Sequence, residues 1–102
     1  MTLSASDLEI SDFDAAELLT DEETIAAYLT ASFASGDQAE LLQALNTVAR
    51  ARGMTELSRK TGIQRESLYR TLSGSSQPRF DTIAKISSAL GVAIEFTPKV
   101  AY

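Results

Sequence analysis

The side chains best suited to recognition chemistry in this sequence lie close together, between residues 64 and 73. Arginine can donate two hydrogen bonds to O6 and N7 of guanine, and glutamate can accept one from N4 of cytosine. Arg65, Glu66 and Arg70 supply these groups, and the two arginines are also suited to phosphates. On a helix over 65–73 the outward positions would be Arg65, Glu66, Ser67, Tyr69 and Arg70. These residue types predict a helix that contacts nucleic acid.

Catalytic chemistry is poorly supplied in this sequence, which contains no histidine and no cysteine. It therefore lacks the usual general base, the commonest metal ligand, and any thiol for nucleophilic catalysis or a disulfide. Asp12 and Asp14 could together bind a cation, but two neighbouring acids make a weak site. We therefore expect a binding protein with no enzymatic activity, no cofactor and no metal site.

The predicted recognition helix follows a second short helix across a tight turn. A helix over about 56–61, with Thr55 as its N-cap, would end before Gly62, because glycine takes the positive φ that such a turn requires. The small side chain of Ser58 would let the two helices approach. Apolar residues would fill the angle between them: Leu57, Ile63, Leu68 and Leu72. This is the pattern of a DNA-binding helix-turn-helix, and the alternative is an αα-hairpin with a solvated basic face.

A polar loop after these helices adds a further candidate contact. Ser75, Ser76 and Gln77 precede Pro78, and Arg79 follows it. Hydroxyl, amide and guanidinium groups are suited to backbone phosphates. Because an ordinary exposed loop has the same composition, only Arg79 is predicted to bind. The predicted DNA-binding residues are Thr55, Gln64, Arg65, Glu66, Ser67, Tyr69, Arg70 and Arg79.

Three longer helices are predicted to support this pair. Capping patterns mark their starts at Thr20, Asp37 and Asp81. The helices would cover, in chain order, about 21–34, 37–52 and 81–90. Residues 92–97 alternate between apolar and polar types, which predicts a short strand closed by Pro98. The predicted fold class is all-α, with five helices, an acidic N-terminal arm and a short C-terminal strand.

The formal net charge of −5 conceals two oppositely charged halves. Residues 1–49 hold ten acids and no Lys or Arg, a net charge of −10. Residues 50–102 hold all nine basic residues and four acids, a net charge of +5. Such segregation favours two partners, one basic and one polyanionic, over the alternative of a mildly uneven surface. No apolar run is long enough to span a membrane, so no membrane partner and a cytoplasmic location are expected.

Several stretches of the sequence are similar to known proteins. Three blocks resemble the Cro/C1-type (lambda-repressor-like) helix-turn-helix domain of lambdoid phage repressors. They are Leu57–Gly74, Pro78–Phe80 and Ala89–Val92. The probable addiction-module antidote proteins, which are HigA-like antitoxins of type II toxin–antitoxin systems, resemble the stretches Ser11–Ala16, Ala27–Leu29, Ala49–Met54 and Arg65–Arg70. The resemblance covers about residues 10–96. The chain departs from the family at Gln64, where a Ser often caps the recognition helix, and at Ser58, where Ala is usual.

The resemblance implies an antidote that neutralises a co-encoded toxin of the RelE/ParE type, a small basic protein, and represses its own operon. Residues 1–36 would then form an acidic toxin-binding arm and helix, and residues 37–102 the DNA-binding domain. Charge would steer the arm to the toxin, and apolar side chains would anchor it. The predicted toxin-binding residues are Asp12, Phe13, Asp14, Leu18, Leu19 and Tyr28. The alternative for the arm is a solubility tail.

A homodimer on double-stranded operator DNA is also expected, because a palindromic operator matches a two-fold protein dimer. Ile94–Phe96 could pair with its own copy across the two-fold axis, or cap the core. Two other binding roles stay open at this point. One is a stand-alone phage-type transcriptional repressor without a toxin partner, and the other is a pure protein-interaction scaffold. A neighbouring gene for a small basic protein would favour the antitoxin.

Overall fold

The computed structural model describes Leu19 and residues 21–99 of the chain. Most of this part is helical, in the order α3 (Glu22–Ala34), α4 (Gln38–Arg52), α5 (Met54–Thr61), α6 (Arg65–Leu72) and α7 (Phe80–Ala89). The predicted all-α class with five helices is therefore confirmed for the described residues. None of these helices is long and apolar enough to cross a membrane.

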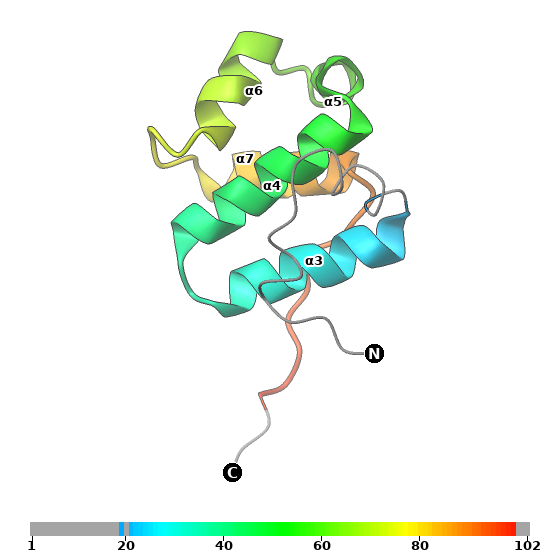
Figure 1. Cartoon of the computed structure of the whole chain (residues 1–102), viewed down its shortest axis with the longest axis vertical. Helices are drawn as coiled ribbons and strands as arrows, with labels where there is room; N and C mark the ends of the chain where they lie inside the picture. Colours follow the sequence, from blue (N-terminus) through cyan, green and yellow to red (C-terminus); the bar gives the residue numbers. More distant parts are fainter. Residues whose placement is uncertain (1–18, 20, 100–102) are drawn as a thin grey trace.

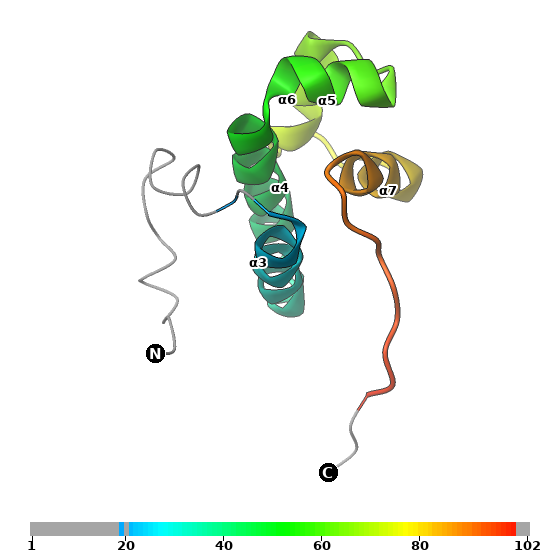
Figure 2. The same ribbon diagram turned by 90° about the vertical axis from the view of Figure 1, so that its right-hand side faces the viewer.

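Helix α4 is the central element of the fold. Figure 1 shows α3 along one side of α4 and α6 on the opposite side, with α5 following the C-terminal end of α4. Helix α7 packs against α5, and Figure 2 shows it beside the α5–α6 pair. One core joins the helices, and its largest fully buried side chains are Ile25, Leu45, Val48, Leu57, Leu68, Leu72 and Ile86. This shared core holds α6 firmly against α4.

The first two helices begin at aspartate caps. Asp37 is the N-cap of α4 as predicted, and its Oδ1 accepts a hydrogen bond from the Ala39 amide at 2.9 Å. The predicted cap of α3 is wrong by one residue, since Asp21, not Thr20, stands at the N-cap. Asp21 Oδ1 accepts from the Thr24 amide at 2.7 Å. A carboxylate is a strong cap because it also meets the positive end of the helix dipole.

The starts of α5 and α7 also differ from the predictions. Helix α5 begins at Met54 with Gly53 at its N-cap, so Thr55 lies in the first turn and caps nothing. Gly53 is also the C-cap of α4. It is the single residue between the two helices, and as a glycine it has no side chain that could cap α5. Helix α7 begins at Phe80, which places Asp81 in its first turn, where its charge favours the helix dipole.

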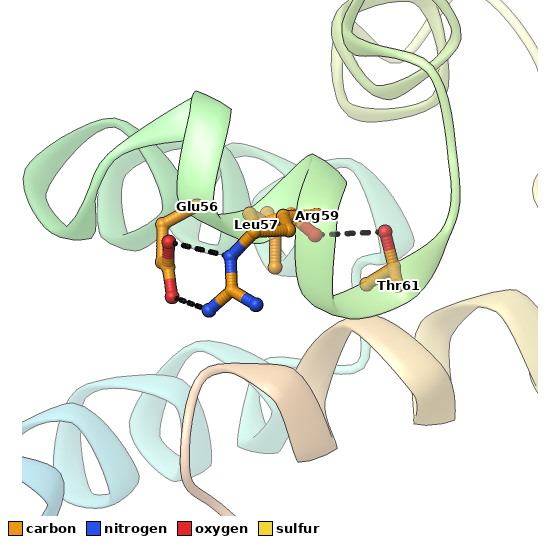
Figure 3. Close-up of polar contacts among 4 residues, drawn as sticks. All are labelled: Glu56, Leu57, Arg59 and Thr61. Atoms are coloured by element: carbon orange, nitrogen blue, oxygen red, sulfur yellow. Dashed lines mark hydrogen bonds and ion pairs between the residues drawn. The ribbon is translucent and has the colours of Figure 1, made fainter.

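The connection between α5 and α6 is three residues long and has the predicted glycine at its first position. Gly62 adopts a left-handed conformation with φ of +76°. Two hydroxyl groups brace the turn: Ser58 Oγ donates to the carbonyl of Ile63, and Thr61 Oγ1 donates to the carbonyl of Leu57 at 2.8 Å (Figure 3). Thr61 Oγ1 also accepts from the Ile63 amide at 3.2 Å. These bonds set the angle between the two helices.

The predicted strand over residues 92–97 is not formed. These residues have no regular secondary structure, and no strand occurs elsewhere in the described part of the chain. A strand needs a partner for its backbone hydrogen bonds, and the described helices offer none. Val92 packs on the core, but Ile94 is 44% exposed and Phe96 is 94% exposed. The segment runs away from the helices in both views (Figures 1 and 2).

Candidate nucleic-acid interface

Helix α6 presents a polar outer face because its apolar residues lie on the opposite side. Leu68 and Leu72 are almost fully buried and fix the helix to the core. Arg65, Glu66 and Arg70 are exposed, as the sequence predicts for a recognition face. Two half-buried residues separate them, Ser67 and Tyr69. The helix is thus rigidly held while its charged side chains face solvent.

Two long hydrogen bonds link the arginines of this face to neighbouring hydroxyl groups. Arg65 Nη2 donates to the Tyr69 hydroxyl at 3.4 Å, and Arg70 Nη2 donates to Ser67 Oγ at the same distance. Both acceptors are hydroxyl groups without a negative charge, so neither partner neutralises the charge of its arginine. The guanidinium groups are oriented but remain able to bind an anion.

The predicted residues outside α6 are less closely connected to this face. Gln64 is the exposed N-cap of α6 and makes no side-chain capping bond, as expected of a poor cap. Thr55 is exposed in the first turn of α5. Arg79 is exposed just before α7, and its Nε donates to Asp81 Oδ1 at 3.2 Å. A surface pair of this kind is weak, so Arg79 is only partly neutralised.

One residue of this surface was missed in the sequence. Arg50 lies in the last turn of α4, and its guanidinium carbon is 5.4 Å from the centroid of the Tyr69 ring. Arg65 approaches the same ring at 5.9 Å. Arg50 Nε also donates to Asn46 Oδ1 at 3.3 Å. Only the packing of α4 against α6 reveals that Arg50 belongs here, although a basic residue in a last helical turn is itself unremarkable.

The six arginines of the chain, all within the described residues, fall into two groups. Three form ion pairs with carboxylates: Arg52 with Glu22, Arg59 with Glu56, and Arg79 with Asp81. The other three have no carboxylate partner in the described part of the chain. They are Arg50, Arg65 and Arg70, the arginines gathered at α6. The arginine charge that carboxylates of the described residues do not neutralise is therefore concentrated on one surface.

The pair on α5 illustrates the contrast. Arg59 Nε donates to Glu56 Oε2 at 3.1 Å, and a second nitrogen contacts the other carboxylate oxygen (Figure 3). The hydrogen bonds from Arg59 hold the pKa of Glu56 below its usual value, and the same contacts raise the pKa of Arg59. The carboxylate satisfies two of the guanidinium donors, so Arg59 is less available to an external anion than the arginines at α6.

The predicted toxin-binding residues are only partly within the described structure. Asp12, Phe13, Asp14 and Leu18 lie outside the described residues. Leu19 is 4% exposed and belongs to the core. Tyr28, on α3, is half-buried and packs against that core. The part these residues play in toxin binding stays a prediction, as does the division of the chain at residue 36.

The fold and this surface together define a small all-α protein that presents a cationic helix face. The chain belongs to a family described as "Probable addiction module antidote protein", whose model matches residues 9–98. It is 41% identical over 87 residues to an uncharacterised protein of Haemophilus influenzae, a match that covers 85% of this chain and 90% of that relative. No solved structure matches the chain. The chain is thus a member of this family of probable antidotes, and an addiction-module antidote in general has a cognate toxin as its partner.

Proposed function

We propose that this antidote is a HigA-like antitoxin that neutralises a RelE/ParE-type toxin and represses its own operon by binding DNA. In this proposal α5 and α6 form the helix-turn-helix of a Cro/C1-type domain, and α6 enters the major groove. The chain acts by binding alone, without catalysis, and does so in the cytoplasm, where operon and toxin are found. The proposal combines the antidote family with the chemistry of the α6 surface.

The observation that carries the DNA-binding part is the set of arginines without carboxylate partners. Arg50, Arg65 and Arg70 surround an exposed helix face and have no described carboxylate to neutralise them. An anionic ligand with regularly spaced charges suits such a face, and duplex DNA also offers base edges to Arg65 and Glu66. The turn at Gly62 supports the same reading, because it matches the three-to-four-residue connection of a helix-turn-helix.

The charge of the first half supports the toxin part. All ten acids of residues 1–49 lie in a stretch without a basic residue, and a basic toxin is the complementary partner. Five of those acids are described, and all five are exposed on α3, on α4 or in the residues before them: Asp21, Glu22, Glu23, Asp37 and Glu40. Helix α3 lies across α4 from α6 (Figure 1). A toxin bound on the α3 side would therefore leave α6 accessible.

A homodimer completes the proposal for DNA binding. One α6 helix reads one half-site, and two-fold symmetry matches the palindromic operators of such repressors. Light scattering of the purified protein and the stoichiometry of its DNA complex would measure this directly.

Fluorescence anisotropy tests the DNA-binding part. The full chain is titrated into a labelled duplex from the region upstream of its own gene, and into a scrambled duplex of equal length and composition. We expect tighter binding to the upstream duplex by a factor of about a thousand or more, the usual range for specific repressors. Equal affinity for both duplexes would contradict sequence-specific repression, and no binding to either would contradict DNA binding altogether.

Co-expression tests the toxin part. The neighbouring basic protein is expressed alone and together with this chain, and growth and co-purification are measured. Growth arrest that the chain relieves, with recovery of a complex of the two, is the expected result. A neighbour that arrests growth but neither binds the chain nor is relieved by it would contradict neutralisation. DNA binding without any toxic neighbour would instead indicate the stand-alone repressor.

A further inference from the structure

Arg50 occupies an unusual place for a residue of the α6 surface. It belongs to α4, fifteen positions before the first residue of α6, and it lies outside both helices of the proposed helix-turn-helix. Its guanidinium carbon nevertheless lies 5.4 Å from the centroid of the Tyr69 ring, in the second half of α6. The side chain is exposed. The packing of α4 on α6 therefore adds a third helix to the cationic surface.

The neighbouring arginine of α4 shows that this placement is selective. Arg50 and Arg52 are two residues apart, so their side chains leave the helix roughly 200° apart. Arg52 reaches back to Glu22 at the start of α3, with 3.5 Å between Nη2 and Oε1. Arg50 faces the opposite way, toward α6, where the described residues offer it no carboxylate. Arg52 thus forms an ion pair between two helices of the fold, whereas Arg50 adds its charge to the α6 surface.

The contacts of Arg50 orient its side chain without neutralising it. Asn46 Oδ1 accepts from its Nε at 3.3 Å, which leaves the terminal nitrogens as donors. The Tyr69 ring attracts the guanidinium by a cation–π contact and attracts Arg65 in the same way. Two cations that share one ring repel each other, and a bound anion would relieve that repulsion. A phosphate group has the charge and the acceptor oxygens for this.

We propose that Arg50 is a phosphate-binding residue, which extends the DNA interface from α5 and α6 to the C-terminal turn of α4. Tyr69 and Asn46 act as positioning residues that hold its guanidinium toward the DNA backbone beside the groove that α6 enters. The inference rests on the proposed DNA binding, and it assigns backbone contact to Arg50 while base contact is left to side chains of α6. Backbone contacts fix register and add affinity without reading sequence.

The test compares matched variants of the full chain in the anisotropy titration. Arg50→Gln and Arg52→Gln remove the same charge two residues apart on one helix, and Arg50→Lys keeps the charge but loses the planar fork. Each variant is titrated against the upstream and scrambled duplexes at several salt concentrations between 50 and 200 mM, the range over which phosphate contacts weaken most visibly. Thermal unfolding checks that each variant is folded.

We expect Arg50→Gln to weaken binding to both duplexes by a similar factor of several-fold and to lower the salt slope by about 1. Arg50→Lys should keep the slope, and Arg52→Gln should leave the affinity for both duplexes within about twofold. Tyr69→Leu should weaken binding to both duplexes in part, because it releases Arg50 together with Arg65. Should Arg50→Gln prove unfolded, Arg50→Met, which removes the same charge and keeps much of the side chain's length, takes its place in the comparison with Arg52→Gln.

Three outcomes would overturn the inference. An unchanged slope and affinity for Arg50→Gln, on DNA that the natural chain binds, would leave the proposed function intact and remove Arg50 from the interface. A loss confined to the upstream duplex would make Arg50 a base-reading residue. A natural chain that binds neither duplex would overturn the proposed DNA binding together with this inference.

Discussion

Tyr69 is the residue that joins the core of this protein to its cationic surface. The ring is half-buried and packs against the core, while its outer part contacts Arg50 and Arg65. Tyrosine suits this double role because it combines a large apolar ring with a polar tip. A long hydrogen bond from Arg65 to the hydroxyl, at 3.4 Å, adds little to the ring contacts. The ring itself, more than its hydroxyl, organises the arginines.

Two substitutions of Tyr69 separate the ring from the hydroxyl. Tyr69→Phe keeps both cation–π contacts, so we expect DNA affinity and stability close to those of the natural chain. Tyr69→Ala should lower the free energy of unfolding by roughly 2–3 kcal/mol, less than the 3–5 of a fully buried ring, and should weaken DNA binding as well. Urea unfolding followed by circular dichroism, with anisotropy on the folded protein, measures both effects. A strong loss of DNA binding in Tyr69→Phe would instead assign the recognition to the hydroxyl.

Asp21 gives the fold a pH dependence with a definite sign. The hydrogen bonds from the amide and hydroxyl of Thr24 hold the pKa of Asp21 below its ordinary value of 3.8, with a smaller contribution from Arg52. Because the folded pKa is lowered, the stabilisation is present above the ordinary value and is lost as the pH falls through the folded pKa. At a pH below the folded pKa the side chain of Asp21 is protonated, and the neutral carboxyl is a poorer cap for α3.

The matched variant for this effect is Asp21→Ser, whose neutral hydroxyl can still cap α3. We expect the natural chain to be the more stable of the two near neutral pH, and its advantage to shrink as the pH falls below about 4. Thermal unfolding midpoints measured across that range check this. A difference between the two midpoints that stays constant with pH would show that the carboxylate charge contributes nothing to the cap.

At the scale of the elements, the spacing of leucines and the positions of glycines in the sequence predicted well where the helices lie and where they end. The ends of α4 and α5 fall at Gly53 and Gly62, as expected of residues that tolerate positive φ. Starts were less predictable, because several capping residues often lie side by side and only geometry selects one of them. The strand over 92–97 was wrong because alternation reports one face of a segment, not whether a partner strand is present.

In the candidate site, too, positions that depend on one helix could be predicted from the sequence, and positions that depend on how helices pack could not. The exposed positions of α6 follow from its helical period, so Arg65 and Arg70 could be placed from sequence. Arg50 could not, because its approach to Tyr69 depends on how α4 crosses α6. The pairing of Arg79 with Asp81 was equally invisible in the pattern, although the two residues are neighbours in sequence.

The two glycines that bound α5 offer a clean comparison of backbone strain. A Cβ atom added at Gly53 or Gly62 would meet no atom within 4 Å beyond the adjoining residues of the chain, so substitution mainly tests conformation. Gly62 is left-handed helical, and Gly62→Ala should cost about 1–2 kcal/mol. Gly53 has φ of +107° and ψ of +118°, a region still less open to alanine, so Gly53→Ala should cost more, up to roughly 3 kcal/mol. Urea unfolding of both variants measures the order, and a larger loss at Gly62 would contradict it.

At the scale of the whole molecule, opposite charges are separated in space as well as in sequence. The described acids of the first half lie on α3, on the first turn of α4 and just before these helices, and the unpaired arginines lie at α6 across α4 (Figure 1). Residues 1–18 add five further acids: Asp7, Glu9, Asp12, Asp14 and Glu17. Their charge repels DNA at a range set by salt, and a basic partner would cancel it. The net charge of −5 is therefore compatible with DNA binding.

Deletion of residues 1–18 tests this division of labour. The cut keeps Leu19, which is 4% exposed and part of the core, so the helices should stay folded. We expect the shortened chain to lose relief from the toxin and to bind the upstream duplex as tightly as the full chain, or more tightly at low salt, because five negative charges are gone. Growth on toxin co-expression and anisotropy at two salt concentrations measure these effects.

A full-length variant with all five acids replaced by their amides separates charge from apolar contact. If charge mainly steers the encounter, this variant should bind the toxin with a slower association rate but an only modestly faster dissociation rate, and it should share the gain in DNA affinity. If the apolar residues of the arm are the anchors, substituting Phe13 should speed dissociation from the toxin and leave DNA binding unchanged. Full relief of toxicity by the deleted chain would contradict both, and would move the toxin contacts to α3 and the exposed acids beside it.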